Sequence, residues 1–191
     1  VSRTPIREAI LRLARENLVE VVPKSGTFVT RISISALPEA PIARCALEGA
    51  TTRAAAQFAS RSQILELHAV LERQRELAAQ GDVLNFYLAD EAFHEKLATI
   101  GRLPGLWQMS PATTLQVDRF RHLTLPEVGR MNMFIDEHSA VVTAIEARDA
   151  GEASAAMGRH LTGLQLHIKN VVEAHPDFFI HGADLDHLFV I

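Results

Sequence analysis

The apolar positions of the first thirty residues change from helical to strand spacing. Those of residues 6–13 recur on one face of a helix, Ser2 can cap that helix, and Pro5 suits its first turn. Residues 18–22 and 27–30 are rich in β-branched side chains and flank a turn that contains Pro and Gly. This pattern predicts a helix of about four turns followed by a β-hairpin.

From residue 34 onward the pattern predicts long helices that are separated by single Pro, Gly or capping residues. The expected helices run from Pro38 or Pro41 to about Ala59, from Ser60 or Ser62 to Gly81, from Asp82 to Gly101, from Pro104 to about His122, from Pro126 to Arg148, and from Gly151, after an Asp149 cap, to Ala174. Short loops place consecutive helices antiparallel. We therefore expect a mainly α protein, with a helix and hairpin over residues 1–33, an all-α antiparallel bundle over 34–177 and a C-terminal tail over 178–191.

The composition limits the chemistry that the chain can perform. Its 191 residues are 48% hydrophobic and 22% charged, as in an ordinary globular protein. The single cysteine, Cys45, excludes an internal disulfide and a site made of several thiolates, so any metal must be held by histidine and carboxylate. We find no apolar run of about 20 residues and no signal-peptide pattern, which predicts a cytoplasmic protein without a membrane partner.

Basic residues are concentrated at the N-terminal end. Residues 1–33 hold six Lys or Arg and three Glu, whereas the whole chain has a formal net charge of −4. Arg3 and Arg7 lie one helical turn apart, beside Ser2 and Thr4, so both guanidinium groups can enter the major groove of DNA together. The alternative interpretation is a solvated helix start with two exposed arginines.

Four potential metal ligands fall on inward helix faces. Asp90 and His94 are spaced i, i+4 on one predicted helix, whereas His138 and His160 lie within the apolar stripes of two later helices. A single buried histidine usually has only a hydrogen-bond partner. Three inward histidines and an inward aspartate favour one shared divalent cation, and this ligand set suits zinc, nickel, iron, cobalt and manganese alike.

The N-terminal segment closely resembles the second half of the winged helix-turn-helix of GntR-family bacterial transcription regulators. The resemblance rests on the run V-S-R-T-P-I-R-E-A-I at residues 1–10, then Leu13, L-V-E at residues 18–20 and G-T-F-V at residues 26–29. It implies DNA contacts from Ser2, Arg3, Thr4 and Arg7 in the helix and from Lys24 and Gly26 in the wing. In that family, further helices precede this point in the DNA-binding domain, and they are absent from this sequence. We therefore expect either that the DNA-binding domain is an N-terminally truncated remnant or that this chain starts inside its gene.

Residues 36–176 resemble the all-α ligand-binding domain, called FCD, of the FadR-type branch (the FadR subfamily) of GntR regulators. The matching patterns are Arg44-x-x-Leu-Glu48, Asp90-x-x-Phe-His94, Glu137-His138 with A-I-E-A-R-D at residues 144–149, Ala153, and His160-Leu161.

This resemblance implies a ligand site with named residues. In metal-binding members, the positions of Asp90, His94, His138 and His160 hold one divalent metal, such as zinc or nickel, with open positions for water or a small carboxylate effector. Arg44 is the candidate to bind the effector carboxylate. Arg121 is a weaker candidate, for which we expect a surface role.

The favoured hypothesis is a transcription regulator rather than an enzyme. A homodimer would bind operator DNA, and a metal with a small organic acid would modulate that binding. The alternative is a metal-dependent hydrolase or thiol transferase of a DinB-like helical bundle. Four protein ligands leave less room for catalysis, and only Glu91 and Glu137 lie near enough to act as general bases, although solvated helix-face carboxylates are commoner. A third hypothesis is a regulator that dimerises but no longer binds DNA.

Overall fold

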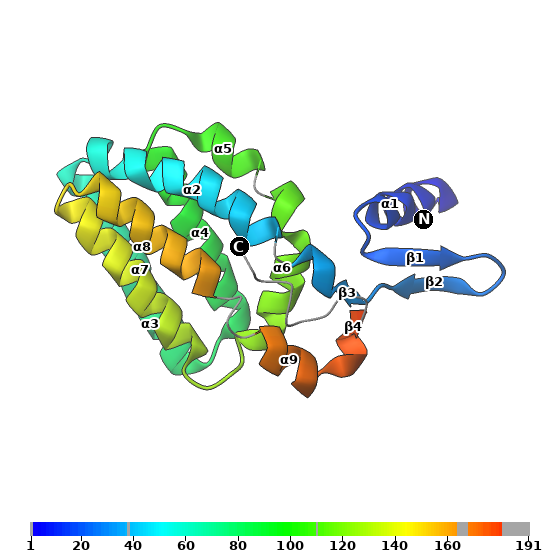
Figure 1. The fold of residues 1–191 in the computed structure, drawn as a ribbon. Helices are drawn as coiled ribbons and strands as arrows, with labels where there is room; N and C mark the ends of the chain where they lie inside the picture. The colour runs from blue at the N-terminus through cyan, green and yellow to red at the C-terminus, as the bar shows by residue number, and fades with distance from the viewer. Residues whose placement is uncertain (1, 38, 110, 164–167, 181–191) are drawn as a thin grey trace.

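The fold consists of a small N-terminal unit beside a larger helical body, as seen in the computed structural model (Figure 1). The structure describes residues 2–37, 39–109, 111–163 and 168–180. We call α1, β1 and β2 the head, and helices α2 to α9 the body. Within the described residues, no helix has the length and hydropathy that crossing a membrane requires.

The head is a helix and an antiparallel hairpin. Helix α1 (Arg3–Arg15) begins after Ser2, whose side chain accepts a hydrogen bond from the Thr4 amide at 3.4 Å. Strands β1 (Val19–Val22) and β2 (Gly26–Val29) form the hairpin. In α1, all of which the structure describes, no residue is buried. The head therefore has little apolar core of its own.

The helices of the body surround a common core. Their bounds are α2 (Glu39–Phe58), α3 (Arg61–Gln80), α4 (Val83–Ile100), α5 (Pro104–Met109), α6 (Pro111–Thr124), α7 (Arg130–Glu146), α8 (Ala150–Gly163) and α9 (Ile168–Ala174). Helix α2 packs on α8 and α4, and α7 packs on α8 and α3. Leu67, Phe93, Val141 and Met157 are fully buried where these helices meet. The predicted fold class, a mainly α chain with a helical bundle after a helix and hairpin, is confirmed.

A second hydrophobic core brings together the segment before α2 and the segment after α9. Strand β3 (Ile32–Ser33) pairs in parallel with β4 (Phe179–Ile180). A short 3-10 turn (Ile34–Ala36) follows β3, and a second 3-10 turn (Pro176–Phe178) precedes β4. Phe179 is fully buried and lies against Phe120 of α6, with ring centroids 6.3 Å apart. The segment expected as a tail thus contributes to the core, and its residues 181–191 lie outside the described part of the chain.

Two of the predicted helix bounds were wrong. The expected helix from Pro104 to about His122 is divided into α5 and α6, because Pro111 lacks an amide hydrogen and is tolerated only in the first turn of a helix. The helix expected to open at Pro126 begins only at Arg130, after Gly129 with φ 81°. The last expected helix, from Gly151 to Ala174, is described as α8 and α9, and its residues 164–167 lie outside the described part of the chain.

Candidate metal and effector site

Helix α4 supplies two of the four predicted ligands. Asp82 caps this helix by accepting a hydrogen bond from the Asn85 amide at 3.1 Å. Phe86, Phe93 and Leu97 on the same helix are buried, and this apolar face turns Asp90 and His94 into the body. Asp90 is 0% exposed and His94 is 1% exposed, so both need partners inside the protein.

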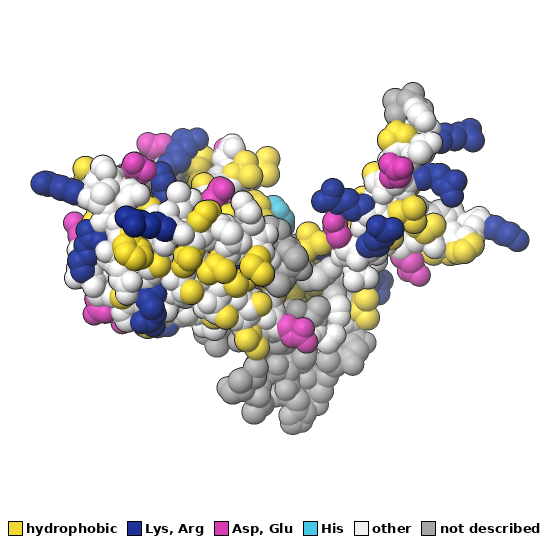
Figure 2. Space-filling view, turned by 90° about the horizontal axis from the view of Figure 1, so that it is seen from above, with side chains coloured by type: hydrophobic (Ala, Val, Ile, Leu, Met, Phe, Trp, Pro, Cys, Tyr) yellow, Lys and Arg dark blue, Asp and Glu magenta, His cyan; other side chains and the backbone are white. Residues whose placement is uncertain are grey.

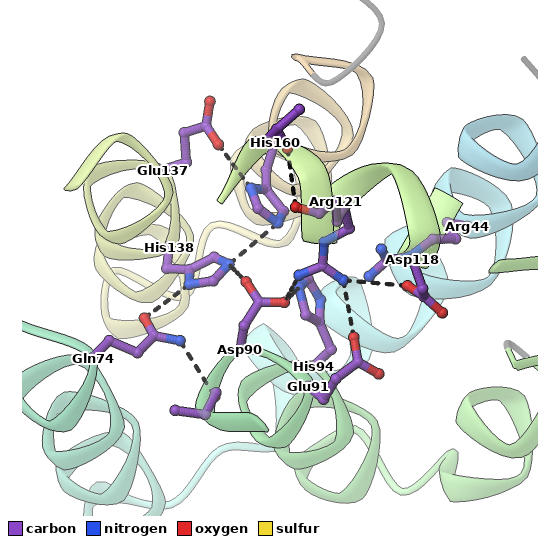
Figure 3. A network of polar contacts seen from close by, with 12 residues as sticks. Arg44, Gln74, Asp90, Glu91, His94, Asp118, Arg121, Glu137, His138 and His160 are labelled. Atoms are coloured by element: carbon purple, nitrogen blue, oxygen red, sulfur yellow. Dashed lines mark hydrogen bonds and ion pairs between the residues drawn. The ribbon is translucent and has the colours of Figure 1, made fainter. Parts of the chain in front are cut away.

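The other two ligands come from α7 and α8 and meet the first pair. His138 and His160 are buried on their helices. One ligand atom from each of Asp90, His94, His138 and His160 lies within 4.8 Å of the other three (Figure 3). The structure therefore brings together all four residues that the sequence singled out.

Two of the histidine rings have a hydrogen-bonded oxygen at Nδ1, and the third has a carboxylate oxygen close to that atom. The His138 Nδ1 lies 3.0 Å from Oε1 of Gln74, and the His160 Nδ1 lies 2.8 Å from Oε2 of Glu137. The His94 Nδ1 lies 2.6 Å from Oε2 of Glu48, but neither atom has a hydrogen-bond partner among the described residues. Carboxylate and amide oxygens only accept, so neutral His138 and His160 rings carry their hydrogen on Nδ1 and a lone pair on Nε2.

The Nε2 atoms face one another and Asp90, and few hydrogen-bond donors lie near them. The Nε2 atoms of His138 and His160 are 3.2 Å apart, and the His138 Nε2 is 3.6 Å from Oδ1 of Asp90. The His94 Nε2 and the Asp90 Oδ1 are buried and lack any hydrogen-bond partner among the described residues. Buried acceptors without donors fit a site for a cation.

The electrostatic environment favours neutral His138 and His160 and a charged Asp90. Burial lowers the pKa of His138 well below its ordinary value and that of His160 to about 3, and neighbouring ring and guanidinium charges act in the same direction. Burial alone would raise the pKa of Asp90, but the Arg121 guanidinium holds it below the usual range. Neutral imidazole and ionised carboxylate are the forms that ligate metals.

Arg121 lies inside the body, which corrects the expected surface role. It is 3% exposed and forms an ion pair with Oδ2 of Asp90. Its Nη1 atom also lies 3.0 Å from Glu91 and 3.6 Å from Asp118. Arg121 is adjacent to the ligand cluster, and three carboxylates already engage it.

Arg44, the other effector candidate, has a side-chain N–H group that is available to a ligand. Its Nε atom donates to Oε1 of Glu48 at 2.5 Å, and both side chains are 5% exposed. Its Nη2 atom is buried and has no hydrogen-bond partner among the described residues. A buried guanidinium with a free donor is suited to an anionic ligand.

Sequence reasoning missed some of the surroundings of the cluster. The sequence offered Glu137 as a possible general base or a solvated helix-face carboxylate, whereas the structure places its carboxylate at Nδ1 of His160. Gln74 interrupts an apolar stripe on α3, which was a usable but unused indication. His122 of α6 packs against the ring of Tyr87, with centroids 4.5 Å apart.

The predicted DNA-contacting residues lie together on the head. Arg3 and Thr4 are in the first turn of α1, and Arg7 follows one turn later. Lys24 (φ 63°) and Gly26 (φ 156°) form the hairpin tip, where the positive φ angles make a tight turn. Figure 2 shows Lys and Arg side chains extending into solvent around the head.

Family comparisons match both parts of the chain. The FCD domain matches residues 42–163, and the family described as bacterial regulatory proteins, gntR family, matches residues 1–29. The "HTH-type transcriptional repressor RspR" of Escherichia coli is 28% identical over 179 residues, which cover 94% of this chain and 78% of that protein. The "Uxu operon regulator" of Haemophilus influenzae is 31% identical over 205 residues, covering 96% and 76%.

Solved structures support the same fold. The chain described as "E. coli McbR/YncC" superposes with a TM-score of 0.74 at 21% identity, covering 91% of this chain and 87% of that one. A Streptococcus agalactiae GntR chain gives a TM-score of 0.56 at 22% identity, covering 86% and 81%. At these identities the likeness concerns the arrangement of the helices.

Proposed function

We propose, for a chain that belongs to the GntR family of bacterial regulatory proteins and carries an FCD domain, that the body binds one divalent metal ion with a small carboxylate effector. The chain is a DNA-binding transcription regulator, and its relatives are named as regulators rather than enzymes. The hydrolase and thiol-transferase alternative is therefore set aside. The proposal concerns what the regulator senses.

One contact carries the metal proposal. The Nε2 atoms of His138 and His160 face each other at 3.2 Å, while acceptors occupy both Nδ1 atoms. Two neutral rings in this state point lone pairs at each other, which is unfavourable unless a proton or a cation lies between them. Because burial disfavours protonation of both rings, a metal ion is the better partner.

Asp90, His94, His138 and His160 would hold that ion. When bound, it would supply a Lewis-acidic position at which a carboxylate oxygen can bind. Mixed imidazole and carboxylate ligation suits zinc or nickel, and the donor set does not distinguish them.

Arg44 supports the effector proposal. Its buried Nη2 donor would bind the effector carboxylate, and Glu48 would hold the guanidinium in place through Nε. Arg121 would contribute mainly positive charge, because its donors already contact carboxylates. Succinate and citrate are suitable probes for this site, and Arg44→Gln should weaken their binding to the metal-loaded protein.

The chain offers its own spectroscopic probe for the test. Trp107 of α5 is the single tryptophan, and its ring lies parallel to that of His94 with centroids 6.2 Å apart. Adding zinc or nickel to chelator-treated protein should change its emission in a saturable way, and elemental analysis should find about one metal per chain.

A matched pair of histidine variants completes the metal test. His138→Ala should abolish the response, whereas His68→Ala should retain it, because His68 is exposed and contacts Glu146 away from the cluster. Purified wild-type protein that binds neither metal would refute the metal proposal.

The remaining assignments concern DNA and assembly. We propose that residues 1–33 form the DNA-binding unit and residues 34–177 the sensing unit, with Ser2, Arg3, Thr4 and Arg7 on the DNA and Lys24 and Gly26 at the wing. A two-fold homodimer would match a palindromic operator. Light scattering tests the dimer, and the salt dependence of duplex binding should fall by about one unit of slope for Arg7→Ala if Arg7 contacts a phosphate.

A further inference from the structure

We propose that Glu48, Gln74 and Glu137 are positioning residues of the metal site, which hold the three histidine rings so that every Nε2 atom faces the ion. This inference rests on the proposed function for the ion itself. Hydrogen bonds of 3.0 and 2.8 Å carry it for Gln74 and Glu137, and an ion-pair contact of 2.6 Å carries it for Glu48.

Each of these contacts joins two helices. Glu48 on α2 reaches a ring on α4, Gln74 on α3 reaches a ring on α7, and Glu137 on α7 reaches a ring on α8. Glu137 is next to His138 in the sequence but contacts His160 instead (Figure 3). Ring orientation is therefore set by the packing of the bundle, and no histidine is oriented by its own helix alone.

Gln74 differs from the other two because it is neutral and is held at both ends. Its Nε2 atom donates to the carbonyl of Ala89 at 3.3 Å, so Oε1 must face His138 and accept from its Nδ1–H. The side chain is fully buried. An amide here orients the ring without adding a carboxylate beside Asp90, Glu48 and Glu137.

The test compares zinc affinity, measured by competition with a chelator, across variants. Gln74→Leu and Glu137→Ala should weaken zinc binding by about 10–100-fold. Glu137→Gln retains an acceptor and should recover most of that loss. Glu146→Ala is the matched control, since Glu146 contacts the exposed His68 and should leave the affinity unchanged.

A second measurement separates this inference from the metal proposal. In metal-free protein, nitrogen NMR of the rings should find His138 and His160 with hydrogen on Nδ1, and Gln74→Leu should remove that preference at His138. Absence of both zinc and nickel binding by the wild type would refute the proposed function alone. Unchanged ring tautomers, or unchanged zinc affinity in both Gln74→Leu and Glu137→Ala, would overturn the positioning roles.

Helix α6 carries a second inference from different contacts, and it too rests on the proposed function for the metal ion. We infer that α6 transmits occupancy of the metal site to the head, because one of its arginines contacts a metal ligand and another contacts the head. Arg121 pairs with the ligand Asp90, whereas Arg119 donates to the carbonyl of Thr30 and lies 3.3 Å from its Oγ1 atom. Thr30 follows the last strand of the head.

Thr30 ties together the elements of the head. Its amide donates to the carbonyl of Leu18 at 2.9 Å, and its hydroxyl donates to the carbonyl of Asn17 at 2.5 Å. These two residues connect α1 to β1. A movement of Arg119 would therefore act on the helix and the hairpin together.

Arg121, two residues after Arg119 on the same helix, is sensitive to a cation at the site. An ion bound at Asp90 would repel the Arg121 guanidinium and compete with it for the same carboxylate. Glu91 and Asp118, at 3.0 and 3.6 Å, offer Arg121 an alternative position. The buried Val117 and Phe120 link α6 to Ile32, so a shift of the helix would also reach β3.

Hydrogen–deuterium exchange on the full chain tests this path. Zinc should change exchange in residues 17–33 of the wild type. Arg119→Ala should abolish that change but leave the zinc affinity intact, and Arg53→Ala, at an exposed position of α2, should behave as the wild type. Persistence of the zinc effect in Arg119→Ala, or its absence in wild type that binds zinc, would overturn the role of α6.

Discussion

Ile32 and Phe179 pair across two parallel strands that are far apart in the sequence, β3 before the bundle and β4 after it. Ile32 is 3% exposed and Phe179 is 0% exposed. Their side chains share a core with Val117 and Phe120 of α6. The bundle is thereby closed at the point where the chain passes into the head.

This pairing predicts that two adjacent aromatic residues contribute very differently to the free energy of unfolding. Phe179→Ala should lower the free energy of unfolding by about 3 kcal/mol, because it removes a fully buried ring and leaves a cavity. Phe178→Ala should cost less than about 1 kcal/mol, since that ring is 53% exposed. Urea unfolding of the two variants measures both values. Equal losses would show that the β3–β4 contact contributes little.

A second prediction concerns the buried ion pair of Asp90 and Arg121. Asp90→Asn should both remove metal binding and lower the free energy of unfolding by about 3 kcal/mol, because Arg121 loses its fully buried partner. The control is Glu152→Gln, which breaks an exposed pair with Arg159 and should cost less than about 1 kcal/mol. Denaturant unfolding of metal-free protein is the measurement, and a stable Asp90→Asn variant would contradict the role of the pair.

Tyr87 provides a prediction about pH. Burial, with Glu91 and Asp118 nearby, raises the pKa of this phenol to about 12, because each factor disfavours the phenolate. Tyr87 is the single tyrosine, so its ionisation can be followed by ultraviolet absorbance. Ionisation should therefore occur only well above pH 10, the usual midpoint for tyrosine.

Two variants test the cause of that shift. Glu91→Gln should lower the midpoint, whereas Glu95→Gln, which changes an exposed residue of the same helix, should not. Circular dichroism at each pH establishes that the chain is still folded. A midpoint near 10 in folded wild-type protein would contradict the burial of the ring.

The sequence predicted most of the fold because its helix boundaries carry local chemistry. Ser60 caps α3 with a reciprocal bond to Gln63, and Gly81 ends that helix in a left-handed conformation. The pairing of β3 with β4 could not be predicted, since two-residue strands show no periodicity and their partners are distant in sequence. The start of α7 was placed too early because Pro126 fits a first turn equally well whether a helix or a turn follows.

The site was predictable as a set of ligands but not as a network. Inward placement of Asp90 and three histidines follows from helical spacing, and the structure brings them together. The orientation of each ring depends on a residue from another helix, such as Gln74, and sequence spacing contains no information on such contacts. The burial of Arg121 was missed for the same reason, because its partners lie mainly on α4.

The last prediction concerns the close approach of α4 and α2, the helices that carry Asp90 and Arg44. A Cβ atom at Gly101, the C-cap of α4, would lie 2.5 Å from the backbone oxygen of Thr51 on α2, so alanine there must push the helices apart. Gly101→Ala should therefore lower the free energy of unfolding by about 1–3 kcal/mol and weaken zinc binding. Gly105→Ala is the matched control, because its Cβ would meet no atom within 4 Å and alanine favours helix. Thermal unfolding and zinc titration of both variants test this, and a Gly101→Ala variant with wild-type stability and affinity would show that the spacing of α2 and α4 does not set the geometry of the site.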